Sequence, residues 1–488
     1  MNARCATTCT ALAAALLAVL IAAAVGACSS ADESSATTGA GGAGGTAISS
    51  TTTTTWTPSG DEGSSCADAL SLSPSPDYPG MWAVGVLNPA GDRDYFRIDA
   101  TEGQWLALFT TANSGADPTK INTVLTVWNE TGGTQLAQND DALDSAGSDS
   151  ELFFHVPSAG TYCLEVRDQS DFLGQAPRGG PSFFYEVGAL PIDFAAMHGF
   201  VLDSDPAAAN DDLGHAQAVI PSMDELMHLG GMLNSASDVD VYDIQLPAGT
   251  PDVMLYVPAD GPSGSGSTLS AVSLSLLNAD GSAVLGELRG PFPAPELLYV
   301  PLAAGVARTY LRVERPTPSI GSNDFYFGKL YPTLIRNYDS EQDDPGNNLP
   351  SGAEQAKQKA PTAPDGVWTV ANVMGTLAAG DVDYWSFSGE AGQSLSLLCG
   401  AWAYGSGLRN MNVTVSSQAN PGLALGAATE SAQATIFWSP DYPLVGTMPV
   451  VTLPATGVYY LRVDLSTGSH DATIAGDYYF CTIWNGTP

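Results

Sequence analysis

The 488-residue sequence contains few basic residues: 16 lysines and arginines stand against 52 aspartates and glutamates, which gives a formal net charge of −36. A surface with this charge repels nucleic acid and anionic lipid headgroups, and it attracts divalent cations. The same acidity also keeps a loop-rich protein in solution. We therefore expect no nucleic-acid partner, and divalent cations are the first candidates for a bound cofactor.

The sequence also lacks the residue spacings of common catalytic centres. It contains no His-Glu-x-x-His zinc motif, no Gly-x-Ser-x-Gly elbow and no phosphate-binding loop. Its clustered carboxylates are placed like metal ligands or turn caps, and not like the acid and base pair of a glycoside hydrolase. We therefore expect that this protein is not an enzyme. The five scattered histidines are His155, His198, His215, His228 and His470.

Long hydrophobic runs are almost absent. The run at 11–25 follows Arg4, is too short and alanine-rich for a membrane span, and leads into Val25-Gly26-Ala27-Cys28. This ending resembles the lipobox of bacterial lipoproteins, in which a signal peptidase cuts before the cysteine and the thiol carries diacylglycerol. The resemblance implies a signal peptide at 1–27, lipid on Cys28, and a membrane-anchored place in the cell envelope, at the outer membrane or cell surface. An ordinary cleaved secretory signal is the alternative.

Residues 28–60 lack the apolar side chains needed for a core, because they are mostly Ser, Thr, Gly and Ala. This composition predicts a flexible tether.

Cysteine is scarce as well. Two of the seven cysteines leave with the signal peptide, and Cys28 is the lipid site. An even number in the rest of an exported chain indicates disulfides, for which three pairings are possible. The most economical pairing joins the two cysteines of the first repeat described below and the two of the third. The four are Cys66, Cys163, Cys399 and Cys481.

The rest of the sequence shows the same order of signals three times, at 61–195, 196–336 and 337–488; we call these ranges the first, second and third repeats. Each begins with an acidic opening segment, continues with Gly-x-Leu, and then has two aspartates before an aromatic residue (DRDYF, DVDVY, DVDYW). A turn glycine and a hairpin follow. Each repeat ends with a closing strand such as GTYCLEV and an aromatic strand (FFYEV, DFYFGKL, DYYFCTI).

Nearly every element of the repeats alternates apolar and polar residues with period two, and none has a useful helical period. In the strand after the aspartates, Phe96, Tyr242 and Trp385 begin the apolar face. Short alternating strands with many Gly, Pro and Asn turns are typical of antiparallel sandwiches and jelly rolls. The predicted fold class is all-β: three tandem antiparallel β-sandwich, jelly-roll-like domains.

Together, the acidic opening segment, Asp-x-Asp-Tyr-Phe and Ala-Gly-Thr-Tyr-x-Leu-x-Val resemble the bacterial pre-peptidase C-terminal (PPC) domain. That family is a β-sandwich related to the collagen-binding domains of clostridial collagenases. Its members usually follow a secreted peptidase and are thought to aid export or substrate attachment. The second repeat departs from the pattern, because two residues are inserted after Gly305 and Thr309 replaces the tyrosine.

The aspartate pairs are the candidate cation ligands. Asp94, Asp240 and Asp383 share the strand parity of the apolar residues, so each begins an inward-facing row and needs a partner: a turn N–H, an arginine or a metal. In the related collagen-binding domains, an acidic segment and an aspartate pair hold Ca²⁺, which takes six to eight oxygens. Turn capping is the alternative. The candidate ligands are Asp203, Asp205, Asn210, Asp211, Asp238 and Asp240 in the second repeat, Glu341, Asp343, Asn347, Asp381 and Asp383 in the third, and, least supported, Asp92 and Asp94 in the first.

Two functions fit these features. The first is a lipid-anchored surface protein whose domains bind an extracellular polysaccharide or protein. The second is a structural or accessory spacer that supports a secreted peptidase or another surface partner. Tryptophans gathered on one exposed face favour the first, whereas burial of the tryptophans in the cores leaves the second open. The tryptophans in question are Trp82, Trp128, Trp402 and Trp438.

Overall fold

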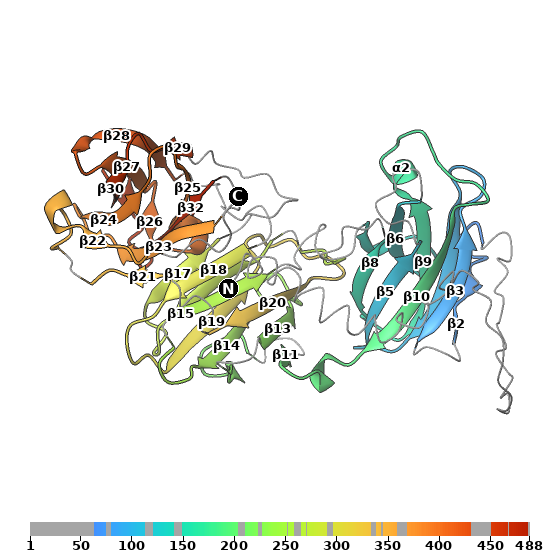
Figure 1. Ribbon diagram of the computed structural model, residues 1–488. Coiled ribbons are helices and arrows are strands. Elements are labelled where there is room, and N and C mark those ends of the chain that lie inside the picture. The colour runs from blue at the N-terminus through green and yellow to red at the C-terminus, as the bar shows by residue number, and fades with distance from the viewer. Residues whose placement is uncertain are drawn as a thin grey trace, which may run out of the picture. The chain divides into compact units, whose positions relative to one another are not determined.

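A computed structural model describes residues 63–486, except 75–79, 113–120, 141–148, 204–209, 223–226, 251, 258–264, 270, 290–295, 333–337, 343–344, 359–367, 431–449 and 467. The regular secondary structure of the described chain is almost entirely strand, as predicted (Figure 1). Its helical elements are one short α-helix and three 3₁₀ turns: α2 (Gln169–Phe172), η1 (Phe194–Ala196), η2 (Pro350–Gly352) and η3 (Trp402–Tyr404). None of the helices in this part is long and apolar enough to cross a membrane. The predicted signal peptide, Cys28 and the tether lie outside the described residues.

The first repeat forms two five-stranded sheets. One has the order β1 (Leu70–Ser71), β4 (Arg93–Ala100), β9 (Gly160–Asp168), β6 (Thr123–Asn129) and β7 (Gln135–Asn139). The other has the order β2 (Ser73–Pro74), β3 (Met81–Val86), β10 (Phe184–Ile192), β5 (Trp105–Thr111) and β8 (Glu151–His155).

The second repeat has the same arrangement, except that its earlier opening strand joins the sheet of the Gly-x-Leu strand and its later opening strand joins the sheet of the aspartate strand. One sheet has the order β12 (Gln217–Val219), β14 (Val239–Gln245), β19 (Arg308–Glu314), β16 (Ser273–Leu277) and β17 (Val284–Leu288). Its other sheet has the order β11 (Phe200–Leu202), β13 (Met227–Met232), β20 (Phe325–Tyr331), β15 (Asp252–Val257) and β18 (Glu296–Pro301).

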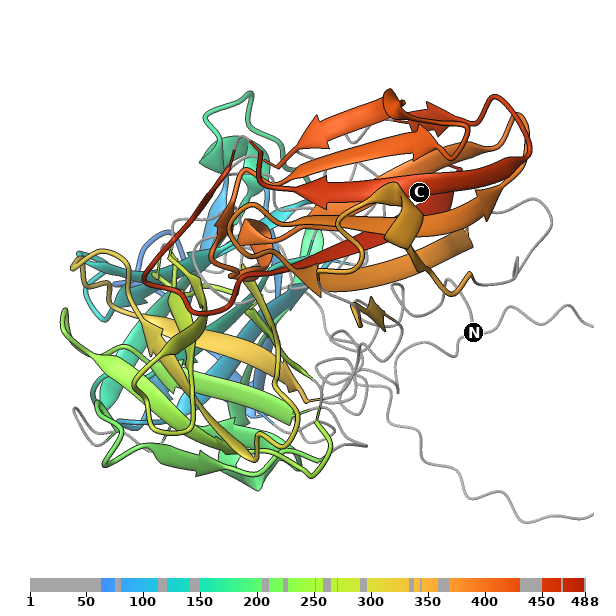
Figure 2. The ribbon, with the colours of Figure 1, turned by 90° about the vertical axis from the view of Figure 1, so that its left-hand side faces the viewer.

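The third repeat, coloured orange to red in Figure 2, follows the same plan. One sheet has the order β22 (Glu354–Gln355), β24 (Val382–Gly389), β30 (Gly457–Asp464), β27 (Asn412–Ser417) and β28 (Asn420–Thr429). The other has the order β21 (Asp339–Ser340), β23 (Trp368–Thr376), β32 (Tyr478–Asn485), β25 (Ser394–Gly400) and β29 (Val450–Thr452), and a small separate sheet pairs β26 (Leu408–Arg409) with β31 (Ser469–His470).

One detail of the sheets differs from the antiparallel prediction. Five of the six short strands of the opening segments pair in parallel with the next strand of their sheet: β1 with β4, β11 with β13, β12 with β14, β21 with β23, and β22 with β24. The sixth, β2, pairs antiparallel with β3. Parallel neighbours require a crossover between them. Between β12 and β14 the crossover is β13, a strand of the opposite sheet. Each opening segment therefore runs beside the strand that carries the aspartates instead of turning back on it.

The two sheets of a repeat contribute side chains to one buried cluster. In the first repeat, Phe96 and Leu164 of one sheet face inward, as the alternation predicted, and belong to the same cluster as Leu108 and Val187 of the other. Corresponding clusters lie in the second and third repeats. Burial of these side chains is the main favourable contribution to folding, at about 25 cal/mol per Å² of apolar surface.

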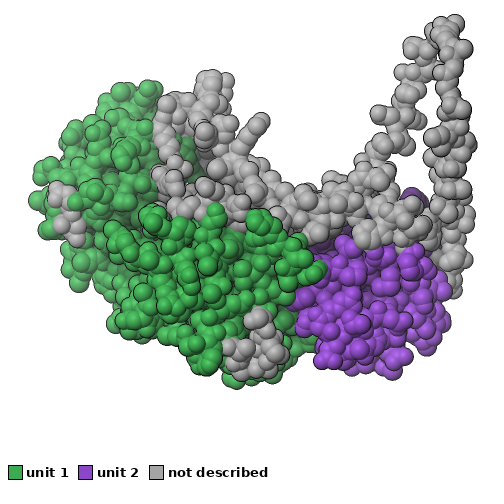
Figure 3. All heavy atoms as spheres, turned by 90° about the horizontal axis from the view of Figure 1, so that it is seen from below, with its two compact units in different colours: residues 1–3, 193–488 green, residues 4–192 purple. Residues whose placement is uncertain are grey.

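The chain divides into two compact units at residues 192 and 193, shown in different colours in Figure 3. The first repeat up to residue 192 lies in one unit, and its last three residues lie with the second and third repeats in the other.

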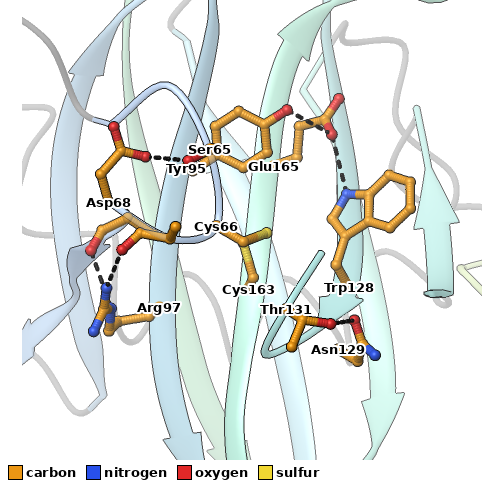
Figure 4. Close-up of a disulfide and its surroundings, with 12 residues drawn as sticks. Ser65, Cys66, Asp68, Tyr95, Arg97, Trp128, Asn129, Thr131, Cys163 and Glu165 are labelled. Atoms are coloured by element: carbon orange, nitrogen blue, oxygen red, sulfur yellow. Dashed lines mark hydrogen bonds between the residues drawn. A yellow bond between two sulfur atoms is a disulfide. The ribbon is translucent and has the colours of Figure 1, made fainter. Parts of the chain in front are cut away.

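Both predicted disulfides are present. Cys66–Cys163 joins the opening segment to β9 (Figure 4), and Cys399–Cys481 joins directly opposite residues of β25 and β32. Each bond therefore lies within one repeat.

Candidate functional site

Each repeat buries the second aspartate of its pair. Asp94, Asp240 and Asp383 are each 0% exposed, at the inner face of β4, β14 and β24. A carboxylate in such a place is stable only when it is hydrogen-bonded, protonated or bound to a cation. The inward orientation predicted from strand parity is therefore observed for all three carboxylates.

A tyrosine from the last strand of each repeat, β10, β20 or β32, supplies one hydrogen bond. The hydroxyls of Tyr185 and Tyr326 donate to Asp94 and Asp240 across 2.6 Å, and that of Tyr479 donates to Asp383 across 2.7 Å. All three tyrosines are buried. The three tyrosines lie in the aromatic strands FFYEV, DFYFGKL and DYYFCTI. Sequence spacing does not connect these tyrosines with the aspartates, because 86 to 96 residues separate them.

Glycine makes room for this contact. In each Gly-x-Leu element the glycine lies opposite the tyrosine in the neighbouring strand: Gly85 faces Tyr185, Gly231 faces Tyr326, and Gly375 faces Tyr479. A Cβ at Gly231 would lie 2.5 Å from the tyrosine Oη, and one at Gly375 would lie 2.6 Å from it. We call this arrangement the Gly–Tyr–Asp contact. It explains why a glycine precedes the aspartate pair in all three repeats.

The first aspartate of each pair has a different place. Asp92 accepts the backbone N–H groups of Asn88 and Arg93, and Asp381 accepts those of Ala378 and Val382. Asp238 accepts the N–H of Asn234 in the equivalent turn. These three carboxylates thus act as turn caps, the alternative reading of the pair.

In the second repeat, the opening segment brings further oxygens to Asp240. The amide nitrogen of Asn210 donates to Asp203 across 3.0 Å, and the carbonyl of Asn210 accepts the N–H of Val241, next to Asp240. The Oδ1 atom of Asn210 is buried and has no hydrogen-bond partner among the described residues. Asp211 instead accepts the N–H of Val239. Asp203, Asn210 and Asp240 are therefore drawn to one place, whereas Asp205 lies outside the described residues.

The third repeat repeats this geometry with glutamate in place of Asp203. The amide nitrogen of Asn347 donates to Glu341 across 2.8 Å, and the carbonyl of Asn347 accepts the N–H of Tyr384, next to Asp383. Within the described part of the chain, the Oδ1 atoms of Asn347 and Asp383 are buried without a hydrogen-bond partner. Asp343 lies outside that part.

Electrostatics at this place favour a positive charge. Burial, with hydrogen bonding to Glu341 and the charges of Glu341 and Asp381, raises the pKa of Asp383 to about 9. Two carboxylates held this close need a proton or a cation between them. Buried amide and carboxylate oxygens are also the ligands that Ca²⁺ prefers.

The first repeat has no asparagine at the position of Asn210 and Asn347. Each of these asparagines lies seven residues before the opening-strand residue that pairs with Tyr242 or Trp385. The residue seven positions before the partner of Phe96 in the first repeat is Gly63. Asp94 keeps its tyrosine but has no side-chain amide from this position. A cation in the first repeat, the least supported of the three expectations, stays a prediction.

No group of three His, Cys, Asp or Glu side chains that could hold a metal ion is found among the described residues. The donor sets at Asp240 and Asp383 differ from such groups because each contains an asparagine. The chemistry of these sites is thus that of mixed carboxylate and amide oxygens.

The outer face of the β4–β9–β6 sheet carries a second group of functional side chains (Figure 4). Glu165 lies at its centre, where it accepts hydrogen bonds from the Tyr95 hydroxyl across 3.2 Å and the Trp128 indole across 3.0 Å. The guanidinium groups of Arg93 and Arg167 lie 3.8 and 3.4 Å from the same carboxylate. Tyr95 and Trp128 are both half-buried, so they present aromatic surface that is fixed in orientation.

The other tryptophans fall between the two predicted fates. Trp82 is half-buried and packs edge-on against Phe109, a residue of the same sheet of the first repeat. Trp402 is half-buried beneath the guanidinium of Arg409. Trp438 lies outside the described residues.

Comparison with known proteins identifies one family likeness. Residues 92–168 match the bacterial pre-peptidase C-terminal domain. The match lies within the first repeat and includes Asp92, Asp94 and the closing strand. The second and third repeats lie outside the match, but they share the Gly–Tyr–Asp contact of the first repeat. No protein of curated function matches the chain.

Solved structures resemble the chain only remotely. The CUB1-EGF-CUB2 region of human MASP-1/3 is 13% identical over 51% of this chain and 99% of that one, with a TM-score of 0.16. The tandem CBM51 modules of a family 98 glycoside hydrolase from Streptococcus pneumoniae are 11% identical over 55% and 88% of the two chains, with a TM-score of 0.18.

Proposed function

We propose that this protein is an exported, non-catalytic array of three PPC-like β-sandwich domains that bind an extracellular polysaccharide or protein, with Cys28 anchoring the chain in a bacterial cell envelope. The observation that carries the proposal is the threefold recurrence of one sheet order and one Gly–Tyr–Asp contact. Three copies of one module favour multivalent attachment, because linked weak sites give a high effective concentration. The two disulfides fit an oxidising compartment outside the cytoplasm.

Calcium is proposed as the stabilising cation of the second and third domains. The buried oxygens of Asn210, Asn347 and Asp383 without hydrogen-bond partners in the described chain support this proposal. A bound Ca²⁺ would neutralise the carboxylates of Glu341 and Asp383 and would tie the opening segment to the strand that follows the turn. Its role would be structural, since extracellular modules use Ca²⁺ in this way at millimolar concentration.

Millimolar Ca²⁺ is expected to raise the unfolding temperature of the full chain relative to chelator, as measured by scanning calorimetry. A ligand that binds only the folded state at about one hundred times its dissociation constant adds roughly 2.7 kcal/mol. Asn347→Ala should remove the third-domain part of this gain, because it deletes a buried ligand oxygen. The matched control is Asn420→Ala, the same change at an exposed position of the third repeat. An equal calcium response in the two variants, or none in the native chain, would show that the aspartates are structural caps alone.

The outer face around Glu165 is the proposed contact surface of the first domain. Tyr95 and Trp128 are held in place by their hydrogen bonds to Glu165, and Arg93 is the most exposed charge beside them. Fixed aromatic rings next to a guanidinium group suit sugar rings or peptide side chains, because little conformational entropy is lost on binding.

Binding of the full chain to immobilised polysaccharides and matrix proteins is expected to identify a ligand class, with and without Ca²⁺. Trp128→Ala should weaken that binding about tenfold, as expected for loss of an interfacial aromatic. Trp82→Ala, in the opposite sheet of the same repeat, should leave it unchanged. Absence of binding across the panel would favour the alternative, a spacer that supports a secreted peptidase or another surface partner.

A further inference from the structure

Strand β32 faces two cores at once. Its residues Tyr479 and Cys481 belong to the buried cluster of the third repeat. Its residues Tyr478 and Phe480, which have the opposite parity, belong to the buried cluster of the second repeat. All four side chains are 2% exposed or less. One strand of the third repeat therefore completes the core of the second.

Aromatic rings make up most of this shared region. The Phe480 ring stacks on that of Tyr299 in β18, with centroids 4.1 Å apart and planes 27° apart. Tyr338 and Tyr404 pack edge-on against Phe480, at 5.4 and 5.8 Å. Tyr299 is fixed in turn, because its hydroxyl donates to Asp252 across 3.1 Å. The packing resembles that inside a domain more than that between separate domains.

The backbones of the two repeats are also hydrogen-bonded to each other. The N–H of Glu287 in β17 donates to the carbonyl of Gly405, and the N–H of Ala475 donates to the carbonyl of Val284, each across 2.7 Å. Val284 and Ile474 form a parallel bridge at the same place. Edge strands of the second repeat are therefore covered by the third repeat, which removes unpaired backbone groups from solvent.

We propose that the second and third repeats form one cooperative folding body with a single unfolding transition, and that β32 couples the Asp383 site to the core of the second repeat. Tyr479 donates to Asp383 on one side of the strand, while Tyr478 and Phe480 fill the neighbouring core on the other. Loss of order in β32 therefore removes packing from both repeats together. A ligand at Asp383 also stabilises the second repeat, since it binds only the state in which β32 is ordered.

The test is pulsed hydrogen exchange with mass spectrometry on the full chain at increasing temperature, with peptides from β14 reporting on the second repeat and peptides from β24 on the third. In the native chain the two midpoints are expected to coincide. Phe387→Ala changes a residue of the third-repeat cluster alone. It should nevertheless lower both midpoints together, by roughly 5 to 10 °C. Phe387→Leu serves as a milder variant if the alanine variant does not fold.

Two further variants make the test specific. Phe480→Ala removes the shared ring and should separate the two midpoints. Phe96→Ala truncates a buried residue in the first repeat and should leave both midpoints in place. The proposal is overturned if Phe387→Ala lowers the midpoint of the third repeat alone, or if Phe96→Ala shifts the second repeat as much as Phe387→Ala does.

Discussion

Gly85→Ala is expected to destabilise the first repeat by about 3 kcal/mol, the upper part of the range for overpacking a well-filled core. A Cβ at this position would overlap the Tyr185 hydroxyl and would lie 2.5 Å from the ring carbon that bears it. Tyr185 is buried and hydrogen-bonded to Asp94, so it cannot move aside without breaking that bond. The variant therefore tests whether glycine is required by the Gly–Tyr–Asp contact.

The measurement is the urea midpoint of first-repeat peptides, read by hydrogen exchange in the full chain. Gly160→Ala is the matched control, because Gly160 lies in β9 of the same repeat and a Cβ there meets no atom within 4 Å. The control should change stability by no more than about 0.5 kcal/mol. Similar midpoints for the two variants would mean that Tyr185 yields readily, and that the glycine is not explained by this contact.

Removal of the Cys66–Cys163 disulfide by the paired change Cys66→Ala and Cys163→Ala is expected to cost the first repeat about 4 kcal/mol. The bond closes a loop with a sequence separation of 97. In the chain-entropy account, loops of this size contribute between 4 and 5 kcal/mol, roughly, by restricting the unfolded chain. It also attaches the opening segment to β9, beside Arg97, which binds the carbonyl of Ala69 (Figure 4).

A local readout separates this disulfide from the other. Without Cys66–Cys163, amide protection of the opening segment before β4 should fall more than that of the rest of the repeat. The corresponding change at Cys399 and Cys481 should leave local order in place, because β25 and β32 remain paired as sheet neighbours. Persistent protection of the opening segment after loss of Cys66–Cys163 would argue that β1 and Arg97 suffice to hold it.

Much of the local order follows from short-range sequence pattern. Alternation in the strand that carries the aspartate pair placed Phe96 and Asp94 on one face. Side chains along a strand alternate with period two whatever the tertiary fold. The even count of cysteines and their division between repeats gave the disulfide pairing, because a bond within one module needs no contact between modules. The aspartate–tyrosine contact was missed, since its partners lie in strands 86 to 96 residues apart and no spacing connects them.

What the sequence by itself determined is the β class, the recurring order of signals, the inward aspartates and the cysteine pairs, all of which depend on local periodicity and on repetition. Only the tertiary structure decided which oxygens of the opening segments reach Asp240 and Asp383, why glycine faces the tyrosine, and that β32 serves two cores. These are contacts between distant segments, and they depend on how the opening strands run in parallel beside β14 and β24. Chain direction and strand neighbours are set by packing of whole sheets, which residue spacing does not encode.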